Sequence, residues 1–325
     1  MADPADREAS ALPALADIRA AHARIASHVH RTPVLTCRSL DAQVGASLYF
    51  KCENFQKIGA FKARGACNAV LSLPDDVARR GVVTHSSGNH GAALAYAAAV
   101  RGIPAWVVMP ENAAAVKQAN VRRLGGTIRL CAANVAAREA ACADVQAATG
   151  ATLIHPFDDA RVIAGQGTAA LELLDEVPGL DAVVAPVGGG GLLSGTAIAV
   201  RATDPRIRVC GAEPANADDA ARSFRSGKVE ALPAAHTIAD GLRTTLSERT
   251  LAAIRVHVAA IATASEEAIV QAMRMTWERM KIIVEPSSAV PLACLLERSL
   301  DLAGARVGVI VSGGNVDLDR LPWQT

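Results

Sequence analysis

The sequence has few aromatic side chains and little net charge. Phenylalanine, tryptophan and tyrosine together make up 3% of its 325 residues, which argues against an aromatic platform for stacking nucleic-acid bases. The formal net charge is +1 and the basic residues are scattered, so we expect no nucleic-acid partner and no attachment to a membrane surface. The longest uncharged run, 182–200, contains Pro186 and several glycines, which is not the pattern of a membrane-spanning helix.

Paired cysteine motifs are also absent. The seven cysteines are scattered, their number is odd, and no two of them form a CxxC motif. This pattern is typical of reduced thiols in a cytosolic protein. The N-terminal segment has early acidic residues and no continuous apolar stretch, unlike a secretory signal or a transit peptide. We therefore expect a cytoplasmic protein.

Apolar, β-branched runs alternate with alanine-rich stretches along most of the chain. Buried strands are predicted within 81–86, 105–110, 181–187, 206–213 and 305–312, and a short strand is predicted after Pro33. Helices are predicted near 12–29 and within 91–102 and 135–150. This alternation predicts an α/β protein with parallel, twisted sheets flanked by helices. The chain is long enough for two lobes or domains.

Lys62 is one of only six lysines among 33 basic residues, and it lies in a small apolar setting, AFKARGA. An arginine cannot give up its proton, whereas a partly desolvated lysine can. The neutral amine can then attack a carbonyl group and form a Schiff base. An exposed lysine in the first turn of a helix is the alternative, and Lys62 alone does not decide between the two.

A run of four glycines follows a predicted strand and precedes a predicted helix. These are Gly188, Gly189, Gly190 and Gly191. Their backbone N–H groups and the helix N-terminus can hold a phosphate, and glycine allows the close approach. The dinucleotide-binding motif GxGxxG is incomplete, because Leu193 or Ser194 occupies the position of its third glycine, although Glu213 could be its acidic residue. A P-loop is excluded, because no lysine follows the glycines. The single phosphate of a smaller cofactor fits better.

Two further polar loops follow predicted strands. The first consists of Ser86, Ser87, Gly88, Asn89 and His90. It can bind a carboxylate at the start of the next helix, although simple capping of that helix is the alternative. The second begins with Ser312 at the end of the last predicted strand, where ligands of open α/β sheets bind. Taken alone, the second loop would be interpreted as a turn.

Together and in this order, AFKARGA around Lys62, SSGNHG at 86–91, GGGG at 188–191 and SGGN at 312–315 resemble the fold-type-II pyridoxal-phosphate enzymes. The resemblance is strongest to the serine racemase and serine–threonine dehydratase family, which includes 3-hydroxyaspartate dehydratases, and runs from about residue 12 to 320. It implies a two-lobed fold like that of the tryptophan synthase β chain, and a homodimer. The large cofactor-binding domain would comprise 1–71 and 155–325, and the small inserted domain 72–154.

The resemblance also implies roles for individual residues. Lys62 would carry pyridoxal 5'-phosphate as a Schiff base and accept the Cα proton of the substrate, beside Phe61. Asn89 would bond the ring hydroxyl, Ser312 the pyridine nitrogen, and the four glycines the phosphate. The residues assigned to the amino-acid substrate are Ser86, Ser87, Asn89, His90, Thr244 and Arg138. Among them, Ser87 would be a second proton-transfer group and Arg138 would meet a second carboxylate, unless it is a surface arginine.

A divalent-metal site is a further implication of the resemblance. Glu213, the carbonyl group of Ala217, and Asp219 would bind Mg²⁺ or Mn²⁺, with water completing an oxygen shell. The alternative is a helix capped by Asn216, with acidic residues in its first turn.

Several departures from the racemase pattern favour elimination as the reaction. These are Ala60, Phe157 and the pair Ser287 and Ser288. We therefore expect a dehydratase that converts an L-β-hydroxy amino acid, of the serine, threonine or 3-hydroxyaspartate type, to a 2-oxo acid and ammonia. An amino-acid racemase on the same site is the alternative. An NAD-dependent oxidoreductase and a non-catalytic α/β binding protein are the hypotheses from other classes.

Overall fold

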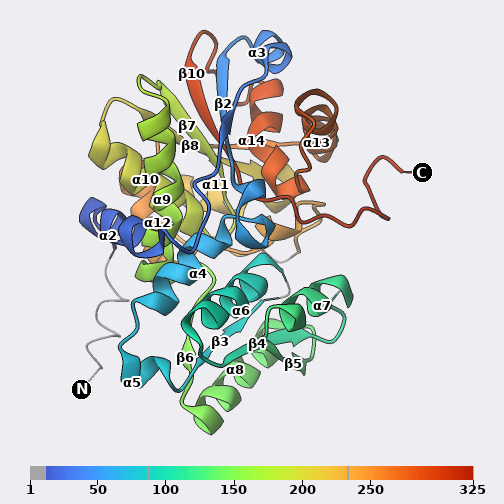
Figure 1. The fold of residues 1–325 in the computed structure, drawn as a ribbon. Helices are drawn as coiled ribbons and strands as arrows, with labels where there is room; N and C mark the ends of the chain where they lie inside the picture. Colours follow the sequence, from blue (N-terminus) through green and yellow to red (C-terminus); the bar gives the residue numbers. More distant parts are fainter. Residues whose placement is uncertain (1–11, 87, 114, 233, 325) are drawn as a thin grey trace.

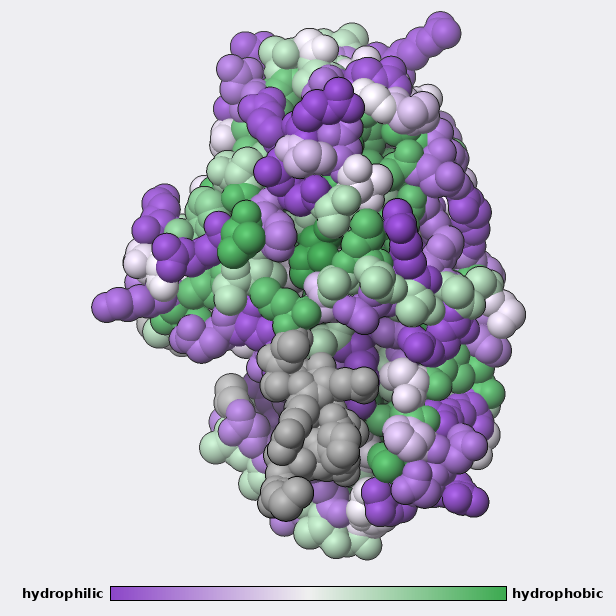
Figure 2. All heavy atoms as spheres, turned by 90° about the vertical axis from the view of Figure 1, so that its left-hand side faces the viewer, coloured by the Kyte–Doolittle hydropathy of each residue, from purple (hydrophilic) through white to green (hydrophobic). Residues whose placement is uncertain are grey.

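The computed structural model describes residues 12–86, 88–113, 115–232 and 234–324, which form two lobes around two separate sheets (Figure 1). The larger lobe is the upper one in Figure 1, and the smaller lobe, built from the middle of the chain, lies below it. Seen from the side in Figure 2, the molecule is wide in its upper part and narrower below. Every helix in the described ranges is too short or too polar to cross a lipid bilayer.

The large sheet has six strands in the order β1-β2-β10-β7-β8-β9. They are β1 (Val34–Leu35), β2 (Ser47–Cys52), β7 (Ala182–Pro186), β8 (Arg208–Pro214), β9 (Ala260–Ala264) and β10 (Arg306–Val311). All neighbouring pairs are parallel except β1 and β2. The register sets Val309 of β10 between Phe50 of β2 and Val184 of β7.

The small sheet has four parallel strands in the order β5-β4-β3-β6. They are β3 (Val82–His85), β4 (Ala105–Pro110), β5 (Thr127–Cys131) and β6 (Thr152–Leu153). Because all four run in the same direction, their carboxyl ends share one edge of the sheet, and the loop that follows β3 begins there at Ser86.

Helices cover the sheets and join the two lobes. In the large lobe they are α2 (Leu15–Ile25), α3 (Arg38–Val44), α4 (Lys62–Leu71), α9 (Ala160–Glu176), α10 (Gly191–Thr203), α11 (Asp219–Ser226), α12 (Glu248–His257), α13 (Glu266–Met280) and α14 (Pro286–Leu296). In the small lobe they are α5 (Asp75–Ala78), α6 (Asn89–Arg101), α7 (Ala115–Arg123) and α8 (Val135–Thr149). Short 3-10 turns are η1 (Glu53–Phe55), η2 (Lys57–Gly59), η3 (Ala215–Ala217) and η4 (Asp240–Leu242).

Apolar cores lie on both faces of the large sheet. Strand side chains point alternately to the two faces, so Val184 of β7 packs in the core that contains α13 and α14, whereas Val183 packs in the core that contains α9 and α10. This explains why β7 is apolar at every position. The core of the small lobe also takes Ala66 and Val70 from α4, which lies between the two sheets in Figure 1.

The α/β class with helix-flanked parallel sheets is confirmed. Each predicted strand is present, with its ends within about two residues of the prediction, and so are the three predicted helices. Strands β2, β5, β6 and β9 were not among the predicted runs. The proposed domain limits, after residues 71 and 154, stay a prediction. The limit after residue 71 falls at the end of α4, a helix that contributes residues to the cores of both lobes.

Candidate active site

A cleft of about 480 Å³ lies between the lobes and contains most of the residues that the sequence predicts for the site. The predicted residues that line it are Phe61, Lys62, Ser86, Asn89, His90, Arg138, Gly188, Gly189, Gly190, Gly191, Thr244 and Ser312. They come from both sheets, so the fold gathers segments that are far apart in the sequence. Ser87 lies outside the described residues, and its role stays a prediction.

Lys62 is the first residue of α4 and faces the cleft. Its Nζ donates a hydrogen bond of 2.7 Å to the carbonyl oxygen of Pro156, and burial lowers its pKa to about 8. The segment before it is fixed to the end of β10, because Phe61 N donates to the Ser312 carbonyl oxygen at 2.9 Å and Ala60 bridges to Gly313. Desolvation therefore increases the neutral fraction of an amine whose position is fixed by the large sheet.

The glycine loop connects β7 to α10. In the part of the chain that the structure describes, the N–H groups of Gly188, Gly189 and Gly190 donate to no protein acceptor. A side chain at Gly189 would place its Cβ 2.3 Å from the ring of Phe157, and Gly190 has a φ of +85°, which favours glycine. Free donors at a helix N-terminus, kept bare of side chains, form a site for an anion.

Three histidines, His85, His90 and His155, line the cleft together with Arg138. Burial lowers the pKa of His90 well below its usual value, and burial lowers that of His155 to about 4. His155 Nδ1 accepts the N–H of Asp158 at 2.9 Å, which fits an uncharged ring. The pKa of His85 is also lowered, first by burial and then by Arg138. Arg138 has no carboxylate partner among the described residues, so its charge is available to a ligand.

A family model described as "Pyridoxal-phosphate dependent enzyme" matches residues 25–313. The chain belongs to this family. It is 54% identical to the beta-hydroxyaspartate dehydratase of Paracoccus denitrificans (strain Pd 1222), over 96% of this chain and 99% of that protein. It is 51% identical to the serine racemase of Oryza sativa subsp. indica, over 95% and 92% respectively. The solved structure of maize serine racemase matches with a TM-score of 0.93 at 49% identity, covering 95% of each chain.

The cleft of this pyridoxal-phosphate-dependent enzyme fits the family's cofactor. The glycine loop offers unpaired N–H donors to a phosphate, and Lys62 offers an amine to an aldehyde. Ser312, which is 2% exposed, lies at the end of β10, and its hydroxyl group is 2.9 Å from that of Ser288. The family match supports the pyridoxal-phosphate interpretation of the glycine loop over the dinucleotide interpretation. It also confirms the fold-type-II resemblance.

The predicted metal residues lie apart from the cleft. Glu213 is the next-to-last residue of β8, and its carboxylate accepts the N–H groups of Ala220 and Ala221 at 3.0 and 2.9 Å. Asp219 is fully buried, and neither of its carboxylate oxygens is within hydrogen-bond geometry of a described residue, although the backbone N–H groups of Asp219 itself and of Leu246 are near enough to act against the rise of its pKa. Burial raises the pKa of Glu213 to about 8 and that of Asp219 to about 6. Two buried carboxyl groups, one of them unpaired, fit a hard divalent cation.

The alternative interpretation of this segment, a helix capped by Asn216, is not what the structure shows. Asp218 occupies the N-cap position of α11 without a side-chain capping bond, and the carboxylate of Glu213 bonds the first N–H groups instead. Glu213 thus has a structural task whether or not a metal ion is present. Asp219 has none that the described residues reveal.

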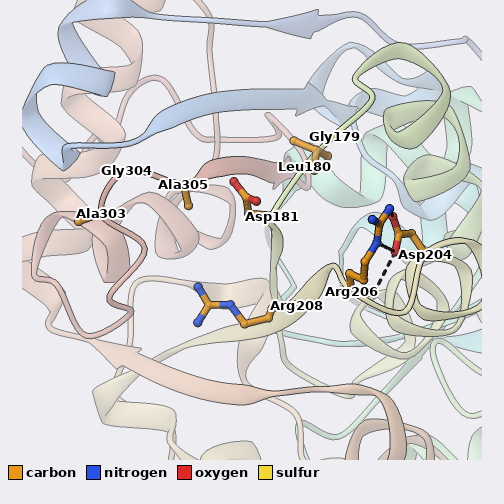
Figure 3. Close-up of a pocket in the computed structure, with 9 residues that line it drawn as sticks. All are labelled: Gly179, Leu180, Asp181, Asp204, Arg206, Arg208, Ala303, Gly304 and Ala305. Atoms are coloured by element: carbon orange, nitrogen blue, oxygen red, sulfur yellow. Dashed lines mark hydrogen bonds and ion pairs between the residues drawn. The ribbon is translucent and has the colours of Figure 1, made fainter.

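A second hollow, of about 600 Å³, lies at the opposite edge of the large sheet (Figure 3). It is lined where β7, β8 and β10 begin, and its residues include Asp181, Asp204, Arg206 and Arg208. Asp204 and Arg206 pair with each other at 2.7 Å. Because ligands of parallel sheets bind at the carboxyl ends of the strands, the inter-lobe cleft is the candidate active site and this hollow is not.

Several cleft residues escaped the analysis of the sequence. Glu285 and Asn315 line the cleft between the predicted motifs, and Lys117 of the small lobe pairs with Asp240 of the large one. Glu285 was visible only as the residue before Pro286, and Asn315 as the last letter of SGGN. His85 ends β3 directly before the serine loop, a position that points to the site.

Proposed function

We propose that the protein is a pyridoxal-phosphate-dependent ammonia-lyase that dehydrates a 3-hydroxyaspartate-type amino acid. The products would be a 2-oxo acid and ammonia. The observation that carries the proposal is Arg138, a cation without a carboxylate partner among the described residues, in the same cleft as Lys62. A substrate with a second carboxylate offers this guanidinium a charge-assisted pair, whereas serine and threonine do not. The similarity to a relative named beta-hydroxyaspartate dehydratase supports the same choice.

Lys62 would perform the proton transfer. The cofactor, when bound, delocalises the negative charge that develops at the substrate Cα. The Lys62 amine, whose pKa is lowered to about 8 by burial, would take the Cα proton, since a base works best with a pKa near the working pH. In the cofactor-free protein, its bond to the Pro156 carbonyl oxygen keeps the amine at the junction of the lobes, where the cofactor would bind.

The remaining site residues would bind and orient. The N–H groups at 188–191 would hold the cofactor phosphate, Ser312 the pyridine nitrogen and Asn89 the ring hydroxyl, with Phe61 beside them. Ser86, His90 and Thr244 line the cleft and would surround the substrate α-carboxylate. A neutral His90 donates from Nε2 to the carbonyl oxygen of Ile154 at 3.1 Å, so it contributes shape and not charge.

Mg²⁺ or Mn²⁺ would bind Glu213, the carbonyl group of Ala217, and Asp219. The support is the unpaired, buried carboxylate of Asp219 beside a second buried carboxyl group. A cation there would favour the ionised form of both groups and would stabilise the start of α11. We also propose a homodimer in the cytoplasm; the seven cysteines, all free thiols, support the reducing compartment.

Racemisation of serine is the second candidate, because serine racemases share about half of this sequence. Racemisation needs proton-transfer groups on both faces of the substrate, and Ser87 would be the second group. Ala60, Phe157 and the serine pair 287–288 depart from the racemase pattern, and we therefore place elimination first. Phe157 packs on the glycine loop and forms an edge-on contact with His155 at 4.7 Å between ring centroids.

A substrate panel tests the proposal. The stereoisomers of 3-hydroxyaspartate, together with L-serine and L-threonine, are assayed for 2-oxo-acid release, and chiral chromatography follows any D-enantiomer. We expect 3-hydroxyaspartate to give the highest kcat/KM, and keto acid to exceed the D-enantiomer. Faster release from serine or threonine would contradict the substrate assignment. Faster accumulation of D-serine than of keto acid would show that racemisation is the main reaction.

A further inference from the structure

Glu285 is a buried carboxylate on the wall of the cleft with no ion-pair partner among the described residues. It is 4% exposed and occupies the N-cap position of α14. Burial, followed by the charge of Asp240, raises its pKa to about 7. A carboxylate without a cation is costly to bury, and a neutral residue of the same shape would avoid this cost. The hydrogen bonds that Glu285 accepts indicate what the carboxylate does.

Glu285 accepts hydrogen bonds from the small lobe and from the loop after β10. Asn89 Nδ2, at the start of α6, lies 3.0 Å and 3.1 Å from the two carboxylate oxygens. The backbone N of Asn315 donates to Oε2 at 3.2 Å. A side chain at Gly313 would place its Cβ 2.9 Å from Oε1, which leaves the carboxylate little room to rotate.

Asn315 completes the arrangement on the other side of the Asn89 amide. Its Nδ2 donates to Asn89 Oδ1 at 2.9 Å and to the Ile58 carbonyl oxygen at 2.8 Å. If the Asn89 amide were flipped, its Nδ2 donor would face the Nδ2 donor of Asn315. Its oxygen would then face the carboxylate oxygens of Glu285. Both contacts would be repulsive, so a single orientation is allowed. One N–H hydrogen of Asn89 is then directed to Glu285, and the second remains for the cleft.

We propose that Glu285 is a positioning residue that acts through Asn89: together with Asn315 it fixes the Asn89 amide so that an N–H faces the cofactor's ring oxygen. The arrangement links four segments, namely the turn before Lys62, the start of α6, the start of α14 and the loop after β10. A donor of fixed orientation stabilises a phenolate oxygen without reorganisation on binding. This inference rests on the family's cofactor and does not depend on which amino acid is the substrate.

A double-mutant cycle on cofactor binding tests the inference. Pyridoxal phosphate is titrated into cofactor-free wild type, Glu285→Gln, Asn89→Ala and the double variant, and the Kd and the absorption maximum are measured without amino acid. Gln must turn an N–H₂ group toward donors from Asn89 or Asn315, so we expect Glu285→Gln to raise the Kd about tenfold and to shift the absorption band. In the Asn89→Ala background the same substitution should have almost no further effect.

Two more variants make the outcome decisive. Glu297→Gln alters a carboxylate at the other end of α14 that bonds the backbone N and hydroxyl of Ser265, and we expect it to leave the Kd and the band unchanged. Asn315→Ala removes the second contact of the amide at an exposed position, and decides the question if Glu285→Gln does not fold. The effect of Asn315→Ala on the Kd should also disappear in the Asn89→Ala background. The positioning role is wrong if Glu285→Gln or Asn315→Ala raises the Kd by the same factor in the Asn89→Ala background as in wild type. It is also wrong if these substitutions leave the Kd and the absorption band of the wild type unchanged.

Discussion

The amine of Lys62 donates a 2.7 Å hydrogen bond to the carbonyl oxygen of Pro156. Lys62 begins α4, whereas Pro156 lies where the chain returns from β6 of the small sheet toward α9 of the large lobe. The bond thus joins the two segments that connect the small lobe to the large one, at the reactive amine. Burial at this junction lowers the pKa of Lys62 to about 8, which an exposed lysine would not show.

Uptake of pyridoxal phosphate by the cofactor-free protein should therefore follow the ionisation of Lys62. Only the neutral amine attacks the aldehyde, and the neutral form dominates above the pKa, so the uptake rate should rise with pH and level off above about 8. Stopped-flow absorbance near 410–420 nm measures the rate. A midpoint near the ordinary lysine value of about 10.4 would contradict the lowered pKa. Lys62→Ala should lose the absorption band and turnover, whereas Lys228→Ala, at an exposed lysine outside the cleft, should keep both.

The sequence predicted the parts of the site that depend on residue type and position in a strand–loop–helix unit. Lys62, the glycine loop and Ser312 are such cases, since a rare residue or a run of glycines at the end of a strand is visible without the fold. Asn89 was assigned through its motif, but its partner Glu285 is distant in the sequence. Contacts across such separations depend on how the lobes meet, and no local pattern records that.

The strands that the sequence analysis missed have a similar explanation. β9 and β5 lie at edges of their sheets and are partly exposed. β5 has polar residues among its five, so it lacks a continuous apolar run, and β9 is rich in alanine, which is uncommon in strands. β2 contains Lys51, a charged residue that is fully buried in the structure because Glu172 of α9 pairs with it. A charge within an otherwise apolar strand is interpretable only once its partner is known.

Lys51 belongs to a buried cluster of ion pairs with Arg64, Glu53 and Glu172. Arg64, two residues after Lys62, donates to both oxygens of Glu53 at 2.7 and 2.8 Å and to both oxygens of Glu172 at 2.7 and 2.8 Å. Lys51 Nζ lies 2.7 Å from Glu172. Since two cations face two carboxylates away from water, removal of one member leaves an uncompensated buried charge.

We expect Glu172→Gln to lower the free energy of unfolding by about 3–5 kcal/mol. Asp175→Asn is the matched control, because Asp175 lies on the same helix and pairs with Arg31 at the surface. The exposed fractions of the two side chains are 72% for Asp175 and 51% for Arg31. That control should cost less than about 1 kcal/mol. Denaturant unfolding of the holoenzyme measures both. Equal effects of the two substitutions would show that the cluster adds no more than a surface pair.

The proposed metal site makes a prediction about stability. Mg²⁺ added to chelator-treated protein should raise the thermal midpoint, because a ligand that binds only the folded state stabilises it. Asp219→Asn should remove this response, since the unpaired carboxylate is the group that a cation would bind. Asp218→Asn is the control, because Asp218 pairs with Arg222 at 2.8 Å and is outside the proposed ligand set. If Mg²⁺ raises the thermal midpoint of Asp219→Asn as much as that of wild type, the metal binds at another place. If Mg²⁺ has no effect on wild type, the role of Glu213 is only to bond the N–H groups at the start of α11.

Arg138 should decide which amino acids the cleft accepts. It is half-buried on α8, lines the cleft and has no carboxylate partner among the described residues, and its charge helps to lower the pKa of His85. Arg138→Ala should raise the KM for 3-hydroxyaspartate about 10- to 100-fold, the effect of losing a charge-assisted contact, and should change the KM for serine little. Arg129→Ala, an exposed arginine of β5 outside the cleft, should alter neither value. Keto-acid release at several substrate concentrations gives both constants. If Arg138→Ala raises the two KM values by the same factor, the guanidinium binds a group that both substrates share, and the assignment of the second carboxylate to Arg138 is wrong.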